Sequence, residues 1–203
     1  MTVKEKQTEE KIFEAATDVF IRKGKDGARM KEIADLAGIN KALLHYYFRT
    51  KERLFNAVFE QIAEVMLRKL APVFDEKLPL EEKIRFFFRE HIAFLQQNPG
   101  LPGFILNEVN RNPERIRKLM DNINPGALWS TLIEKHSEEM KNYNITENRL
   151  PQIMTSMAAM SIFPFAARSV LEVMFEKAGV DFNTYTEERK EFAADFVIKA
   201  LKK

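Results

Sequence analysis

The stretch Met30–Lys51, MKEIADLAGINKALLHYYFRTK, constrains the fold of this chain more than any other. Its first part carries apolar residues at helical spacing and ends at Gly38, since glycine takes the left-handed backbone that ends a helix without steric cost. Asn40 is a good N-cap for a second short helix. The buried side of that helix is predicted to consist of Leu43, Leu44 and Tyr47. The pattern predicts a helix-turn-helix over about residues 30–48, whose second helix can lie in the major groove of DNA.

The second of these helices has an unusual surface composition. Its exposed positions are predicted to include Lys41, Ala42, His45 and Tyr46. No carboxylate occurs between Asp35 and Glu52. Backbone phosphates attract cations, and base edges are read by short or rigid side chains, so this composition favours DNA binding. The alternative is an αα-hairpin packed in a helical bundle that binds no DNA.

Two segments, MKEIADLAGIN (residues 30–40) and LHYYFRTKERL (residues 44–54), resemble the DNA-binding domain of TetR-family transcriptional regulators. The specific features are the aromatic run that closes the second helix and the Lys51-Glu52-x-Leu54 pattern that opens the next one. The resemblance covers about residues 8–60. It implies a three-helix DNA-binding domain at residues 1–50, and a long helix that joins it to a ligand-binding and dimerisation domain at residues 51–203.

The resemblance also implies which residues meet DNA. Arg29 and Lys31 approach DNA ahead of the turn, and Asn40 opens the recognition helix. Base edges or their methyl groups are expected to face Lys41, Ala42, Leu43 and His45. Phosphates are expected to meet Tyr46, Tyr47 and Lys51, although Lys51 can equally be a solvated surface cation. Two positions depart from the family pattern, because Arg29 replaces a Ser or Thr and His45 replaces the more frequent Tyr.

Composition places bounds on the whole chain of 203 residues. The formal net charge is only +2, so nucleic-acid affinity has to come from a local patch. There is no cysteine, hence no disulfide, and the charged N-terminal sequence has no apolar run typical of a secretory signal. No apolar run reaches the roughly 20 residues that span a bilayer. We therefore expect a cytoplasmic protein without membrane contact, and the lack of alternating stretches predicts an all-α fold.

Helical spacing predicts the helices on either side of this motif. A first helix is expected to run from Thr8 to Gly24, and a long helix from Thr50 to about Asp75. Pro79 opens the next helix. Clustered Asn, Pro and Gly residues between residues 98 and 126 predict short, irregular helices after it.

The stretch Leu150–Phe175 is apolar nearly all round, and Pro164 is expected to kink it. A helix that is apolar on every side is buried on every side, which is difficult in one small domain without a second chain. With the last helix, about Thr186–Lys202, this segment is expected to form a four-helix bundle across a two-fold axis. The predicted interface residues are Met154, Met160, Leu171, Phe192, Phe196 and Ala200. The alternative is a purely internal core.

Aromatic and methionine side chains are frequent in the same part of the chain. A pocket built from aromatic and methionine side chains would accept a small, uncharged ligand that is apolar or aromatic. The candidate pocket residues are Phe87, His91, Phe94, Phe104, Asn107, Trp129, Met157 and Phe163. Each of them is also compatible with plain core packing.

Catalytic signatures are missing from the sequence: there is no P-loop, no GxSxG and no HExxH motif. The three histidines show no metal-ligand spacing, so we expect no catalytic site, metal or cofactor. The favoured function is a homodimeric repressor that a small hydrophobic ligand releases from a double-stranded DNA operator. An activator, or a regulator without an effector, fits the same residues. The rival from another class is a helical small-molecule carrier or interaction protein without DNA recognition.

Overall fold

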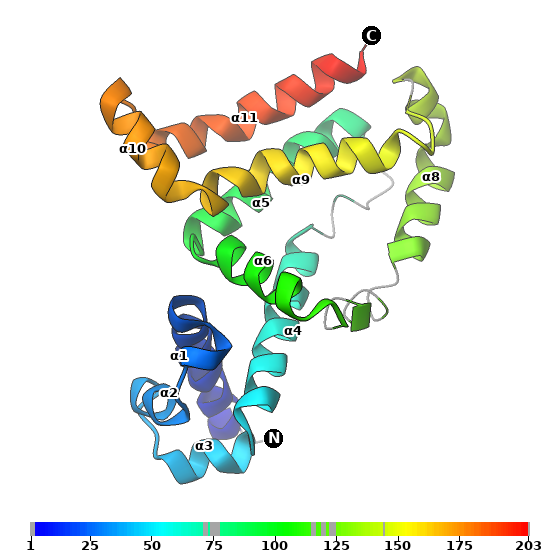
Figure 1. The fold of residues 1–203 in the computed structure, drawn as a ribbon. Coiled ribbons are helices and arrows are strands. Elements are labelled where there is room, and N and C mark those ends of the chain that lie inside the picture. The colour runs from blue at the N-terminus through cyan, green and yellow to red at the C-terminus, as the bar shows by residue number, and fades with distance from the viewer. Residues whose placement is uncertain are drawn as a thin grey trace. The chain divides into compact units, whose positions relative to one another are not determined.

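All regular elements in the described part of this computed structural model are helices, which confirms the all-α prediction (Figure 1). The structure describes residues 3–70, 73, 78–114, 117–118, 121, 125–143 and 145–202, without the side chains of residues 3–4, 67, 125–129 and 131–132. The helices are α1 (Val3–Gly27), α2 (Met30–Leu36), α3 (Lys41–Tyr47), α4 (Lys51–Leu70), α5 (Leu80–Gln97), α6 (Leu101–Arg111), α8 (Pro125–Asn142), α9 (Leu150–Ala166), α10 (Arg168–Ala178) and α11 (Phe182–Leu201).

The chain forms two compact units, Met1–Val65 and Met66–Lys203. The N-terminal unit consists of α1, α2, α3 and most of α4. Thr50 caps α4 as predicted, since its hydroxyl oxygen accepts a hydrogen bond from the Arg53 amide at 3.2 Å. The predicted end of this helix near Asp75 lies outside the described residues.

The core of the N-terminal unit is made by one face of each of its four helices. Phe20 of α1 packs edge-on against Phe55 of α4, with ring centroids 4.8 Å apart. Phe13 packs in the same way on Phe48, just after α3. The fully buried apolar side chains include Ile12, Ala16, Val19, Phe20, Ile33, Leu44, Leu54, Phe55 and Val58. These contacts hold α3 at the surface of the N-terminal unit.

Helix α1 is longer than predicted at both ends. It begins at Val3 instead of Thr8, because the intervening charged residues are good helix formers. At Gly24 the backbone leaves the helical region, with φ 66° and ψ 174°, and one further turn follows before Gly27. Gly24 thus breaks the helix, as the sequence predicts, without ending it.

Replacement of Gly24 by alanine should destabilise the N-terminal unit by about 1–3 kcal/mol, because that backbone region is accessible essentially only to glycine. Nothing lies within 4 Å of the place that the alanine β-carbon would take, so the cost comes from the backbone alone. Gly103→Ala is the matched control, since Gly103 lies within α6 and also has open space around it. Urea unfolding should show no loss for the control, and equal losses for both variants would contradict this account.

In the C-terminal unit, α11 packs along α5, and α9 packs against both (Figure 1). Ala193 and Ala194 of α11 are fully buried, and such small residues let the helices approach closely. On α5, the buried side chains include Phe88, Ile92 and Leu95. This three-helix layer forms the core of the unit.

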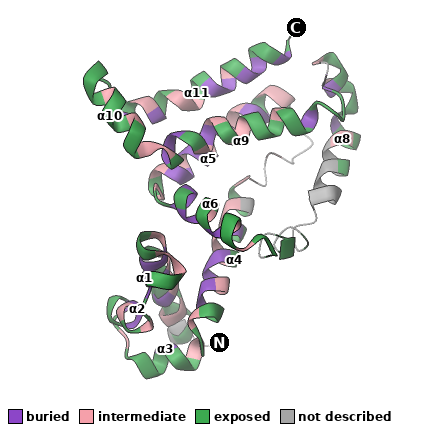
Figure 2. Ribbon diagram, in the orientation of Figure 1, coloured by how far each residue is buried: buried purple, intermediate pink, exposed green. Residues whose placement is uncertain are grey.

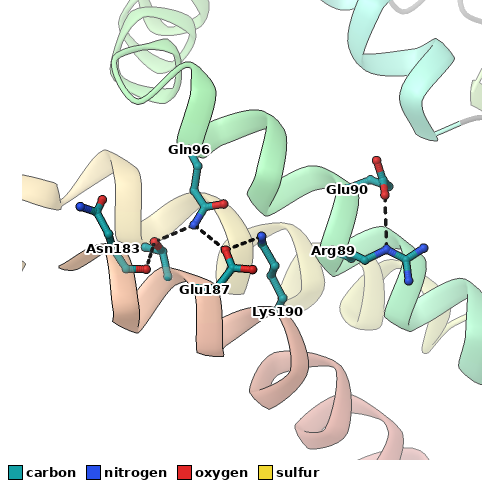
Figure 3. A network of polar contacts seen from close by, with 7 residues as sticks. Arg89, Glu90, Gln96, Asn183, Glu187 and Lys190 are labelled. Carbon is teal, nitrogen blue, oxygen red and sulfur yellow. Dashed lines mark hydrogen bonds and ion pairs between the residues drawn. The ribbon is translucent and has the colours of Figure 1, made fainter. Parts of the chain in front are cut away.

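Polar contacts fix the register of α11 on its neighbours (Figure 3). The Gln96 side-chain amide donates to the Thr186 hydroxyl at 3.1 Å and to the Glu187 carboxylate at 3.2 Å. Glu187 also accepts from Lys190 at 2.6 Å. On α9, the Met160 carbonyl accepts a hydrogen bond from the Arg189 guanidinium at 2.8 Å. The helices α5, α9 and α11 are therefore tied together near the turn from α10 to α11.

The predicted single apolar helix from Leu150 to Phe175 is two helices, α9 and α10, which are bent by 75° to each other. The break falls at Ala167, shortly after Pro164, whose ring cannot donate a backbone hydrogen bond. In the single chain α10 has no buried residue (Figure 2), and the sequence analysis expects a second chain to complete the burial of this stretch. Residues 101–103 belong to the predicted segment of clustered Asn, Pro and Gly residues, and they open α6, where Pro102 is tolerated in the first turn.

No single helix of the described ranges has both the length and the hydropathy of a membrane-spanning segment. The bent pair α9 and α10 passes that test only when taken together. Within the same ranges, no three His, Asp or Glu side chains are grouped in a way that could hold a metal ion.

Candidate functional site

The turn between α2 and α3 has the geometry of a helix-turn-helix. Gly38 adopts the left-handed conformation with φ 67°, and the Ile39 amide donates back to the Ala34 carbonyl at 3.0 Å. The Asn40 side-chain oxygen accepts from the Leu43 amide at 2.7 Å, which confirms the predicted N-cap. Arg29 precedes α2 and gives it no side-chain cap. Short-range hydrogen bonds therefore set the direction of α3.

One face of α3 is open to solvent, as predicted. Leu44 is completely buried and anchors the helix, and Tyr46 is 79% exposed. The predicted placement of Leu43 on the buried side is wrong: it is 37% exposed, because the neighbouring helices cover only the opposite side, where Leu44 lies. The exposed residues of α3 are Lys41, Ala42, Leu43, His45 and Tyr46. Tyr47 is half-buried, whereas Arg29 and Lys31 are exposed near α2.

Two carboxylates of the N-terminal unit, one on α2 and one in the first turn of α4, are paired with lysines of α1. Glu32 lies 2.7 Å from the Lys23 ammonium, and Glu52 lies 2.8 Å from the Lys25 ammonium. Lys25 also lies over the Phe55 ring, 5.9 Å from its centroid. The charges of these two acids are balanced within the unit, and the exposed face of α3 itself carries no carboxylate.

Lys51, a predicted phosphate contact, has partners inside the protein. Its ammonium donates to the backbone carbonyls of Asp26 at 3.1 Å and Ala28 at 3.0 Å. The side chain is half-buried and joins the first turn of α4 to the connection between α1 and α2. Sequence reasoning missed this role, because carbonyl acceptors leave no mark in a sequence.

Among the candidate pocket residues, the structure brings His91, Phe87 and Met157 together with Ser161. The His91 Nδ1 atom lies 2.8 Å from the Ser161 hydroxyl oxygen, and its ring centroid lies 5.2 Å from that of Phe87. The Ser161 hydroxyl in turn lies 3.1 Å from the Met157 carbonyl oxygen. Phe94 and Phe104 are buried, whereas Asn107 and Phe163 lie at the surface. The side chain of Trp129 lies outside the described residues.

Burial lowers the pKa of His91 to about 4. Between about pH 6.5 and pH 4, the unfolded chain therefore binds a proton at His91 that the folded chain does not bind. We expect the free energy of unfolding to fall by about 2–4 kcal/mol from this group as the pH is lowered through that range. Urea unfolding of the wild type and of His91→Gln at several pH values measures the effect. The carboxylates contribute equally to the pH dependence of both proteins, so the difference between their free energies of unfolding reports on His91. Parallel pH profiles would contradict it.

His136 is a second buried histidine, which the sequence analysis did not include among the site residues. His136 of α8 is 5% exposed, and its Nε2 atom has no hydrogen-bond partner among the described residues. Its Nδ1 atom lies 3.4 Å from Glu139, whose other oxygen accepts from the Leu80 amide at the start of α5. A buried imidazole of this kind is a candidate polar contact for a ligand.

Exposed apolar side chains are frequent on α9, α10 and α11 of the C-terminal unit. Phe192 and Phe196 are 61% and 58% exposed, and their rings stack at 6.3 Å. Of the other predicted interface residues, Met154 and Ala200 are exposed, and Met160 and Leu171 are half-buried. Phe163, Val170, Val173 and Met174 of the same predicted segment are also exposed, although they are not among the six predicted interface residues. Exposed apolar patches of this kind mark interaction surfaces.

The sequence model of the family described as "Bacterial regulatory proteins, tetR family" matches residues 12–58 of this chain. These residues comprise the larger part of α1, the helix-turn-helix and the start of α4. This part of the chain therefore matches the DNA-binding domain of the TetR family. The match supports DNA-binding transcriptional regulation as the general function of the chain.

Relatives and solved structures agree with this assignment. The nucleoid occlusion factor SlmA of Vibrio cholerae is 29% identical over 149 residues, which are 70% of this chain and 74% of that protein. The transcriptional regulator RutR of Escherichia coli is 42% identical over 69 residues, but only 34% of this chain and 32% of RutR are covered. A TetR transcription regulator from Haloarcula marismortui has the same fold, with a TM-score of 0.63, 19% identity, and coverage of 96% and 98% of the two chains.

Proposed function

We propose that this TetR-family chain is a homodimeric repressor that binds a palindromic operator and leaves it when a small apolar or aromatic ligand binds. The observation that carries the proposal is the open face of α3, which presents a lysine, a histidine and a tyrosine while the neighbouring acids Glu32 and Glu52 are paired. A surface of this composition suits the major groove and its phosphates.

Within this proposal, the residues of α3 divide into two groups. Lys41, Ala42, Leu43 and His45 meet base edges or thymine methyl groups. Tyr46 and Tyr47 meet phosphates, as do Arg29 and Lys31 from the start of α2. Asn40 sets the first turn of the recognition helix through its side-chain cap.

A second copy is the partner proposed for the apolar surface of α9, α10 and α11. Phe192 and Phe196 are large aromatic side chains that are exposed in the single chain, and they are suited to a closely packed interface. Two recognition helices related by a two-fold axis read a palindrome whose half-sites lie about one helical turn apart or more. One short helix reads only a few base pairs, so dimerisation supplies the necessary specificity.

The proposed effector region lies in the C-terminal unit, where Phe87, His91, Phe94, Phe104 and Met157 supply mainly apolar surface. His91 is neutral at physiological pH, because burial lowers its pKa to about 4, and this suits an uncharged ligand. Ligand binding would act through α4, which is continuous from Lys51 to Leu70. A coupling of about 1–3 kcal/mol changes operator affinity by roughly 5–150-fold.

Selection of bound duplexes from a randomised DNA pool tests the proposal. A palindromic consensus at physiological salt is the expected result, and recovery of no preferred sequence by the folded dimer would refute it. The selected duplex then serves to screen hydrophobic compounds. Compounds that raise the thermal stability of the protein should also release the DNA.

A second candidate function comes from the SlmA relatives, whose name states a role in nucleoid occlusion. This function also requires DNA binding, but it predicts that loss of the protein allows cell division across the nucleoid. Microscopy of cells that lack the protein distinguishes the two functions. A repressor instead changes the transcription of genes next to its operators and leaves division sites unchanged.

A further inference from the structure

The side chain of His45 is held in a defined orientation on the open face of α3. Its Nδ1 atom lies 3.2 Å from the backbone carbonyl oxygen of Arg49, beyond the end of the helix. A carbonyl oxygen only accepts hydrogen bonds, so the hydrogen of the neutral imidazole resides on Nδ1. The other ring nitrogen, Nε2, is then a hydrogen-bond acceptor on an exposed side chain.

The residues around His45 allow a base edge to approach it. Ala42 lies one turn earlier on the same face and is short, and Lys41 lies four residues before His45 and carries a cation. The lysine provides donors only, whereas the histidine provides an acceptor. The two side chains therefore suit different base edges.

In the major groove, only two bases present a hydrogen-bond donor, adenine through its N6 amino group and cytosine through its N4 amino group. Guanine and thymine present acceptors at the corresponding places, and these repel a second acceptor. We propose that His45 is a specificity-determining residue that accepts a hydrogen bond from the exocyclic amino group of adenine or cytosine through Nε2. The Arg49 carbonyl selects the tautomer that makes this possible. This inference rests on the proposed function, because it requires a DNA-binding α3.

Base analogues in the selected operator test the inference directly. Each adenine is replaced by purine, and each cytosine by pyrimidin-2-one, symmetrically in both half-sites, so that only the amino group is lost. At one position per half-site, the wild type should lose about fivefold or more in affinity, typical of one hydrogen bond. His45→Leu, which has no acceptor, should bind the original and the substituted operator equally well.

Two further substitutions complete the experiment. Adenine replaced by 7-deazaadenine keeps the N6 amino group and removes the N7 acceptor, so it should leave the His45 contact intact. Arg49→Ala keeps the backbone carbonyl and should keep the base preference of the wild type. Two results would overturn the inference and leave the proposed function standing. In the first, 7-deazaadenine lowers the affinity of the wild type but not that of His45→Leu. In the second, removal of the amino group lowers the affinity of the wild type and of His45→Leu equally. Failure to select any sequence would overturn the proposed function, and the inference with it.

Discussion

The replacement of Phe192 by aspartate should convert the proposed dimer into monomers. Phe192 lies on α11 and is 61% exposed in the single chain. Burial of a phenylalanine side chain contributes about 1.5–3 kcal/mol, and a two-fold interface contains it twice. Loss of both contacts, together with the desolvation of two carboxylates, should raise the dimer dissociation constant by about a thousandfold or more. Sedimentation velocity at micromolar concentration measures this directly.

Operator affinity should fall together with dimerisation, since a monomer reads a single half-site. Leu106→Asp is the matched control, because Leu106 is 47% exposed on α6 and lies outside the proposed interface. It makes the same chemical change and should leave the dimer intact. Circular dichroism should show an unchanged helix content in both variants. A dimeric Phe192→Asp variant with normal affinity would place the interface elsewhere.

The helix-turn-helix was predictable because its determinants are local. Gly38, Asn40 and Thr50 each act on backbone groups within a few residues, so their effect can be inferred from spacing alone. The basic and aromatic face of α3 follows from the same periodicity. Leu43 was the exception, since its exposure depends on how far neighbouring helices cover α3.

Features that depend on contacts between distant segments were harder to predict from the sequence. The pairing of His91 with Ser161 joins residues on α5 and α9, and no spacing in the sequence indicates it. The place and size of the bend at Ala167 are indicated only approximately by a proline in the sequence. Apolar content predicted an interface for this region, but only the folded chain shows which side chains remain exposed.

Lys51→Met should lower the stability of the N-terminal unit by about 2 kcal/mol. Methionine preserves most of the apolar stem, but it removes the hydrogen bonds from the ammonium to the Asp26 and Ala28 carbonyls. These bonds hold the connection that leads into α2, so every DNA sequence should be bound more weakly. The measurements are urea unfolding and operator affinity as a function of salt concentration.

The salt dependence separates an internal tie from a phosphate contact. A lysine that neutralises one phosphate contributes about one unit to the slope of log affinity against log salt. Lys31→Met is the matched control: Lys31 is exposed on α2, and its loss should reduce the slope without changing stability. Because two of the three ammonium hydrogens of Lys51 are occupied within the protein, we expect its loss to reduce stability and to leave the slope unchanged. A reduced slope with normal stability would instead restore the phosphate contact that the family resemblance implies.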